Sequence, residues 1–304
     1  MAAAEIRVGT ASWTDHDPFY PPEYSRAAMK SARISYYAKY FSLVEVDSTF
    51  YSLQPARNFQ MWAERTPEHF LFDVKAYGEM TWHHRQDNGE LITPHADTFD
   101  RFRAMLEPIR TSGKLGSILF QFPPWFTFQE ERLEYFETIR EMLPDDGIVV
   151  EFRHRSWLEN AHVDATRSAL QEHHLAYCAV DEPQIGSGSV PPTVLITEPT
   201  FSMVRFHGRN TSTWYGRNLK SSRDRFDYLY SEEELQPWAD RILRISERLE
   251  GGQVHVIANN NASNYGIVNA IDFQRLLGQR PGQGTPLPEG VQATLAMRNE
   301  RQQR

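Results

Sequence analysis

Short apolar runs alternate with longer amphipathic stretches along the chain. The short runs are rich in β-branched and aromatic residues, whereas the longer stretches repeat apolar residues at helical spacing. This pattern predicts strands at Ile6–Ser12, Leu43–Thr49, Phe70–Ala76, Ser117–Phe122, Ile148–Arg153, Ala176–Asp181, Phe201–His207 and Val254–Asn259. It predicts helices at Ala32–Phe41, Arg57–Arg65, Thr98–Ile109, Glu130–Leu143, Val163–His173, Ser231–Leu249 and Tyr265–Leu277.

Eight strand–helix units in 304 residues favour an α/β fold of one (β/α)8 TIM barrel. A doubly wound open sheet is less favoured, because it normally has a glycine-rich first turn and only Gly9 lies near the end of the first strand. We expect the barrel to occupy residues 1–280. Because Pro281–Gly290 is rich in proline and glycine and a polar stretch follows, we expect 281–304 to form a loosely ordered C-terminal tail.

The longest predicted helix has a signal at each end. Ser231 is followed three residues later by Glu234, which is typical of a capping box. Gly251 and Gly252 come directly after the last turn and favour its termination.

Polar side chains recur at the C-terminal ends of the predicted strands, where TIM barrels carry their active sites. They alternate with Val, Phe and Ala, which must face the outer helices, so we expect the charged set to point into the barrel. An unpaired charge there is strongly unfavourable, and such residues must pair with one another or meet a polar ligand. The predicted catalytic residues are Glu45, Asp47, Lys75, Glu151, Asp181 and His207.

Two interpretations of the inward charges remain open. The acids and bases are nearly balanced, so they can form a salt-bridge network, or Lys75, Arg153 and Arg205 can hold an anionic ligand. A desolvated Lys75 is suited to act as a general base or a Schiff-base amine, and the alternative is that it neutralises Glu45 or Glu151. The predicted substrate-binding residues are Trp13, Tyr51, Gln121, Arg153, Trp157, Arg205, Arg209, Asn259, Asn260 and Tyr265.

The loop after the seventh predicted strand is basic. Between Arg209 and Arg225 it holds five basic residues and one acid, Asp224. Loops at this position of a barrel frequently bind phosphate, and the amides at the start of the helix near Tyr265 suit an anion as well. The alternatives are a solvated lid and a helix start capped internally by Ser263 or Asn264.

Seven motifs lie in order at the strand ends: Gly9-Thr-Ala-Ser-Trp13, Glu45-Val-Asp-Ser-Thr-Phe-Tyr51, Lys75-Ala76, Phe120-Gln-Phe-Pro-Pro124, Glu151-Phe-Arg-His-Arg-Ser-Trp157, Val204-Arg-Phe-His-Gly-Arg209 and Asn259-Asn260. Over roughly residues 6–275 they resemble the YecE-like family, also called domain of unknown function 72. The resemblance implies an intracellular TIM barrel of bacterial or archaeal type and supplies no established reaction. The chain departs from the family pattern at Ala11 and Ser12, at Asp47, where Asn is more common, and at Asn261, where an acid is more common.

Composition limits the functional classes. The chain has 32 Lys and Arg against 40 Asp and Glu, a net charge of −8, which disfavours a bulk nucleic-acid binder. The absence of a long apolar run argues against membrane insertion, and one cysteine, Cys178, fits a reducing compartment, so we expect a cytoplasmic protein. No cofactor is predicted. A divalent metal ion held by Glu45, Glu151, Asp181 and His207 is a less favoured alternative, because no ligand spacing supports it.

These observations favour an enzyme that acts on a small phosphorylated, polyhydroxylated substrate by acid–base chemistry at the barrel mouth. A nucleic-acid binding or processing barrel, similar in layout to endonuclease-type TIM barrels, is the first alternative. A non-catalytic ligand sensor is the second. The sequence does not indicate the oligomeric state.

Overall fold

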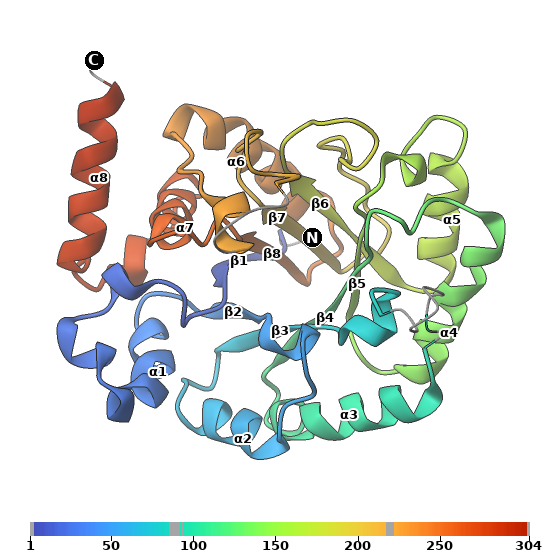
Figure 1. The fold of residues 1–304 in the computed structure, drawn as a ribbon, viewed down its shortest axis with the longest axis horizontal. Helices are drawn as coiled ribbons and strands as arrows, with labels where there is room; N and C mark the ends of the chain where they lie inside the picture. Colours follow the sequence, from blue (N-terminus) through green and yellow to red (C-terminus); the bar gives the residue numbers. More distant parts are fainter. Residues whose placement is uncertain (1–2, 85–91, 93, 217–221, 303–304) are drawn as a thin grey trace.

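The computed structural model describes residues 3–84, 92, 94–216 and 222–302. Eight parallel strands close into one barrel in sequence order, which confirms the predicted (β/α)8 architecture (Figure 1). The strands are β1 (Glu5–Ala11), β2 (Leu43–Val46), β3 (Leu71–Lys75), β4 (Leu115–Gln121), β5 (Ile148–Glu151), β6 (Leu175–Asp181), β7 (Phe201–Phe206) and β8 (Gln253–Ala258).

Helices surround the barrel (Figure 1). In the described residues they are α1 (Arg33–Tyr37), α2 (Ala56–Glu64), α3 (Ala96–Thr111), α4 (Glu134–Met142), α5 (Val163–Glu172), α6 (Glu232–Arg248), α7 (Tyr265–Leu276) and α8 (Glu289–Gln302). α1 is shorter than expected, because the segment before it forms three short 3₁₀ helices between Asp17 and Ala32. No described helix is both long and apolar enough to cross a membrane.

The predicted capping box of α6 is confirmed, whereas the helix ends at the extended Leu249 and not at the predicted Gly251 and Gly252. Ser231 Oγ accepts a hydrogen bond from the Glu234 amide at 3.3 Å, and Glu234 Oε2 accepts one from the Ser231 amide at 2.9 Å. After the helix, Gly252 has a φ of 76°, and a Cβ atom there would lie 1.9 Å from the Thr200 carbonyl oxygen. Only glycine fits this close passage before β8.

The barrel interior is layered. Ala11, Leu43 and Ile257 form a buried apolar layer in the middle of the barrel. Towards the N-terminal ends of the strands, His255 Nδ1 lies 2.9 Å from Asp73 Oδ2. Towards the C-terminal ends lies a second polar cluster, which forms the floor of the candidate active site.

The C-terminal segment differs from the expected loose tail. Residues 289–302 form α8, which lies beside α7 at the edge of the molecule (Figure 1). The Arg298 guanidinium lies 2.5 Å from the buried Asp272 carboxylate of α7, and Val291 is fully buried. A polar segment is ordered here because its few buried contacts are specific, which composition alone did not indicate.

Candidate active site

Arg205 is the centre of the polar cluster inside the C-terminal end of the barrel. Its Nε and Nη2 donate to the two carboxylate oxygens of Glu45 at 2.8 and 2.5 Å, and its Nη1 donates to Glu151 Oε2 at 2.5 Å. All three side chains are buried. The structure therefore brings together three residues predicted to point inward, and here the salt-bridge interpretation is the one that fits.

His207 and Asn259 extend this network. Asn259 Nδ2 lies 2.8 Å from His207 Nδ1, and His207 Nε2 lies 3.1 Å from Glu151 Oε1. This arrangement suits a neutral imidazole that accepts at Nδ1 and donates from Nε2. Burial, together with the nearby charge of Arg153, lowers the pKa of His207 to about 3. Burial acts to raise the pKa of Glu151, but Arg205, His207 and Arg153 hold it well below its usual range.

Arg153 connects the buried network to the mouth. Its Nε lies 3.4 Å from Glu151 Oε1, and its Nη1 contacts Glu182 Oε2. Glu182 Oε1 also accepts a hydrogen bond from the Val190 amide at 2.8 Å. Burial raises the pKa of Glu182 to about 7, although Arg153 opposes this, so the carboxyl can exchange a proton near neutral pH. Glu182 is not among the site residues predicted from the sequence.

The expectation that Asp181 points into the barrel is wrong. Its carboxylate receives Arg209 Nε at 2.8 Å and Nη2 at 2.7 Å, together with Tyr230 Oη and Trp238 Nε1 at 2.7 Å each. These partners belong to the β7–α6 loop and to α6, outside the barrel. Since successive strand residues face opposite sides, the inward acid is the next residue, Glu182.

Lys75 and Asp47 lie at the edge of the network. The Lys75 amine is 4.5 Å from the centroid of the Phe50 ring. Among the described residues it forms neither a hydrogen bond nor an ion pair, so the predicted alternative of neutralising Glu45 or Glu151 is not realised as a direct contact. Buried Asp47 Oδ1 likewise has no hydrogen-bond partner in this part of the chain.

A cavity of about 490 Å³ opens above the network. Gln121 and Arg153 contribute polar groups to it, and Arg225 adds an exposed cation. The Arg153 guanidinium lies 5.1 Å from the centroid of the Trp214 ring. The remaining lining residues are mostly aromatic or small: His83, Pro124, Trp125, Gly188, Trp214, Tyr215, Gly216 and Phe226.

Two predicted aromatic walls belong to the core. Trp157 is fully buried and stacks on Phe152 with 4.4 Å between the ring centroids. Its Nε1 donates a hydrogen bond to the Phe126 carbonyl at 2.6 Å. Trp13 packs edge-to-face against Trp62 at 4.9 Å. A tryptophan next to a strand end fills space equally well in the core, which is why residue type alone misplaced both.

The other predicted binding residues are distributed over the rim and the loops. Tyr51 is 72% exposed, and Tyr265 is half-buried at the start of α7. Asn260 Nδ2 donates to the Tyr228 carbonyl and to Asn269 Oδ1, both at 2.8 Å, so it holds the β7–α6 loop.

Only part of the predicted basic loop lies within the described residues. Arg209 pairs with Asp181, so Arg209 is not available as a free cation at the mouth. Arg217 and Lys220 lie outside the described residues, and the same holds for the side chain of Arg223.

The less favoured metal site does not form with the predicted ligands. Arg205 lies between Glu45 and Glu151, and Asp181 faces away from both. Over the described ranges, no three His, Cys, Asp or Glu side chains gather in a way that could hold a metal ion.

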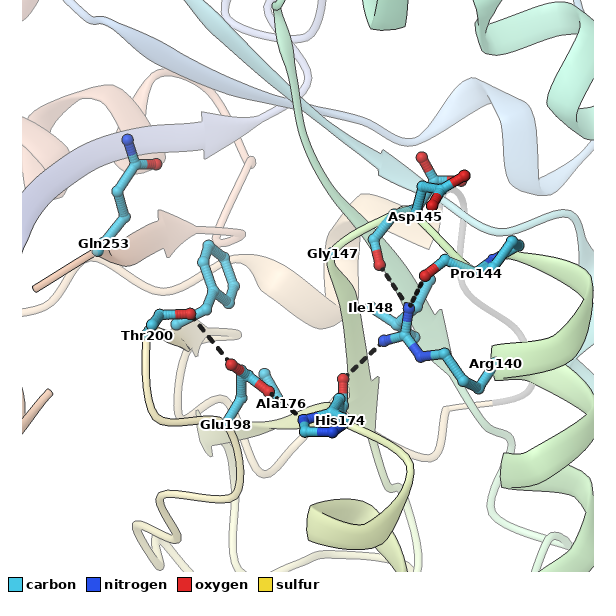
Figure 2. Close-up of a pocket in the computed structure, with 13 residues that line it drawn as sticks. Arg140, Pro144, Asp145, Gly147, Ile148, His174, Ala176, Glu198, Thr200 and Gln253 are labelled. Carbon is cyan, nitrogen blue, oxygen red and sulfur yellow. Dashed lines mark hydrogen bonds and ion pairs between the residues drawn. The ribbon is translucent and has the colours of Figure 1, made fainter. Parts of the chain in front are cut away.

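A larger cavity, of about 690 Å³, lies at the opposite end of the barrel (Figure 2). Its walls include the first residues of β5, β7 and β8, and Arg140 donates there to the carbonyls of Pro144, Asp146 and His174 at 2.7–3.1 Å. Arg140 and these three carbonyl groups satisfy one another's hydrogen bonds. TIM-barrel enzymes place their chemistry at the other end, so the smaller C-terminal cavity is the candidate active site.

Beside the mouth, His16 should produce a measurable pH effect. Burial lowers its pKa to about 4, opposed by Asp15. The unfolded chain takes up this proton near pH 6.5, so stability falls as the pH drops from 6.5 to 4. We expect His16→Gln to reduce that loss by about 3 kcal/mol, as measured by urea unfolding at pH 4 and 7.5. An unchanged difference between the two pH values would contradict this assignment.

Comparison with known proteins gives a consistent result. The family model described as "Protein of unknown function DUF72" matches residues 7–292. The UPF0759 protein YunF of Bacillus subtilis (strain 168) is 36% identical over 277 residues, covering 90% of this chain and 94% of that protein. A crystal structure of a DUF72 family protein from Enterococcus faecalis V583 has a TM-score of 0.80 at 28% identity and covers 90% of this chain and 96% of that one. A DUF72 family protein from Thermotoga maritima MSB8 has a TM-score of 0.75 at 30% identity, covering 90% and 100%.

Proposed function

The chain belongs to the DUF72 family, whose description names no activity, and we propose from its barrel mouth that it is an enzyme acting on a small anionic substrate. The substrate class that suits the cavity is a phosphorylated, polyhydroxylated compound. The reaction class is acid–base chemistry. The observation that carries the proposal is the cavity lined by Arg153, Arg225 and aromatic side chains, with Glu182, which exchanges a proton near neutral pH, in contact with Arg153.

Each part of the cavity has a distinct role in this proposal. Arg153 and Arg225 bind the anion, and the flat rings of Trp125 and Trp214 pack against the carbon skeleton. Glu182 does not line the cavity but contacts Arg153, so its change of protonation near neutral pH changes the charge beside that arginine.

The buried network acts as a positioning element. Three buried residues hold Glu151 in place without reaching the cavity: Glu45, Arg205 and His207. Glu151 in turn orients Arg153. A rigid support of this kind lowers the entropy lost when substrate binds.

Binding of ribose 5-phosphate, followed by tryptophan fluorescence, tests the proposal. Trp125 and Trp214 line the cavity and report directly on its occupancy. We expect saturable quenching that is weakened at least about tenfold in Arg225→Ala, which corresponds to the loss of one charge-assisted hydrogen bond.

Arg101→Ala is the matched control, because Arg101 is an exposed arginine on α3, remote from the mouth. Equal affinity of the wild type and both variants would contradict an anion site at the mouth. Saturable binding together with a complete lack of turnover across sugar phosphates would favour the sensor.

A nucleic-acid ligand is the second candidate, and one observation favours it. Tyr51, Trp125 and Tyr215 are 72%, 41% and 49% exposed, and Trp125 and Tyr215 both line the cavity. Exposed aromatic rings beside cations can stack on unpaired bases. Salt-sensitive quenching by single-stranded DNA, with no response to ribose 5-phosphate, would select this candidate.

A further inference from the structure

We propose that Lys75 is a Schiff-base amine that captures the carbonyl group of an aldehyde or ketone in the mouth cavity. This proposal rests on the function proposed above and narrows its substrate class to an anionic carbonyl compound. The observation that carries it is the position of the Lys75 amine, which lies half-buried near charged side chains yet forms no hydrogen bond or ion pair with any described residue.

Lys75 is the last residue of β3, at the C-terminal end of the barrel. Its side chain is half-buried, and its amine lies 4.5 Å from the centroid of the Phe50 ring. The same ring packs edge-to-face against His83, a lining residue of the cavity, at 4.7 Å. The Phe50 ring thus connects Lys75 to a residue of the cavity wall.

Lys114 shows how this protein treats a structural buried lysine. Its Nζ donates to the carbonyls of Ala63 and Thr66 at 2.5 and 2.8 Å, and to Thr66 Oγ1 at 3.2 Å. Three acceptors satisfy its three protons, as expected for a protonated amine that ties loops together. Lys75 lacks every such acceptor in the described part of the chain, so a structural role does not account for it.

The surroundings of Lys75 favour the unprotonated amine. Burial lowers its pKa, an effect that Asp47 opposes and Arg205 reinforces. A free amine is the nucleophile in imine formation, whereas an ordinary lysine is almost fully protonated at neutral pH. The Phe50 ring beside it accepts no strong hydrogen bond, although its face attracts the protonated form and so opposes the effect of burial.

The step balances without an additional reactant. The nitrogen lone pair of Lys75 attacks the carbonyl carbon, a C–N bond forms, and the C=O π electrons become a hydroxyl group as a proton moves from nitrogen to oxygen. A second proton then converts this hydroxyl into water, the C–O bond breaks, and the C=N bond forms. Asp47 Oδ1 has no hydrogen-bond partner in the described chain, so it is free to accept and return these protons.

Pyridoxal 5′-phosphate is a suitable probe, because it combines an aldehyde, a planar ring and a phosphate group. We expect it to form an imine at pH 7, visible by absorbance, that borohydride reduces to a stable adduct. Peptide mass mapping should locate the adduct on Lys75 at least about tenfold faster than on Lys30 or Lys39, which are exposed on the surface.

Lys75→Arg should abolish the fast reaction, because a guanidinium group stays protonated and is not a nucleophile, and Lys39→Arg is the matched control that should retain it. The thermal midpoint of Lys75→Arg is measured alongside, so that misfolding is recognised. If Lys75 is trapped no faster than Lys30 and Lys39, the Schiff-base proposal is overturned. Ribose 5-phosphate binding to the unchanged protein separates the two proposals. If it binds and Lys75 is not trapped faster, the anion-binding enzyme remains and only the Schiff base is excluded. If it does not bind, both proposals are excluded.

Discussion

Arg205→Met should lower the free energy of unfolding by about 3–5 kcal/mol at pH 7.5. The guanidinium is 1% exposed and binds two buried carboxylates, those of Glu45 and Glu151. Methionine fills a similar volume but leaves both acids without their main counter-charge. Removing one partner of a buried ionic cluster is far more damaging than never having built the cluster.

Chemical denaturation followed by circular dichroism measures this loss. Arg101→Ala is the matched surface control, and we expect it to change stability by less than about 0.5 kcal/mol. The triple variant Glu45→Gln, Glu151→Gln and Arg205→Met should recover most of the loss, because no uncompensated charge remains. A loss in Arg205→Met no larger than that in Arg101→Ala would show that the cluster is not stabilised by Arg205.

The same cluster explains why sequence predicted the barrel interior well. On β2, β5 and β7 each charged residue stands between two apolar ones, so the side that faces the helices is unambiguous. The inward direction of Glu45, Glu151 and Arg205 followed from that alternation. Their pairing did not follow, because three-dimensional proximity across a barrel has no signal in one sequence.

β6 shows where the alternation argument fails. Asp181 and Glu182 are adjacent acids at the end of the strand, and either could have been assigned to the interior. The outward partners of Asp181 come from Arg209, Tyr230 and Trp238, which lie 28, 49 and 57 residues away. The local sequence pattern does not predict partners this distant in the chain. Two successive acids do indicate, however, that the pattern leaves open which of them faces the barrel interior.

Lys75 and Lys114 show the same limit for single residues. Both lysines are next to or within strands in the sequence, and both have a pKa lowered first by burial. Only the structure separates the amine with three acceptors from the one that has none among the described residues. The reactivity of a lysine amine depends on which hydrogen-bond partners it lacks. The spacing of residues in the sequence does not reveal this.

Asp181→Ala should reduce the free energy of unfolding by about 3–5 kcal/mol, because it removes four hydrogen-bond acceptor contacts at once. Tyr230 and Trp238 are both buried, so the indole hydrogen of Trp238 would be left without a partner and the Tyr230 hydroxyl would keep only the backbone carbonyl of residue 181, at 3.5 Å. Arg209 would lose its bidentate pair and retain Glu234 Oε1 at 3.3 Å. We expect the β7–α6 loop to loosen, which amide hydrogen exchange would detect around Tyr230.

The adjacent variant Glu182→Gln distinguishes a structural carboxylate from one that serves the mouth. Asp181→Asn should lower stability and leave ribose 5-phosphate binding unchanged, because its partners lie outside the barrel. Glu182→Gln should leave the contacts of Asp181 intact and strengthen binding of the anion, because the carboxylate that competes for Arg153 loses its charge. The reverse pattern, with binding changed in Asp181→Asn and unchanged in Glu182→Gln, would return Asp181 to the active site and remove Glu182 from it.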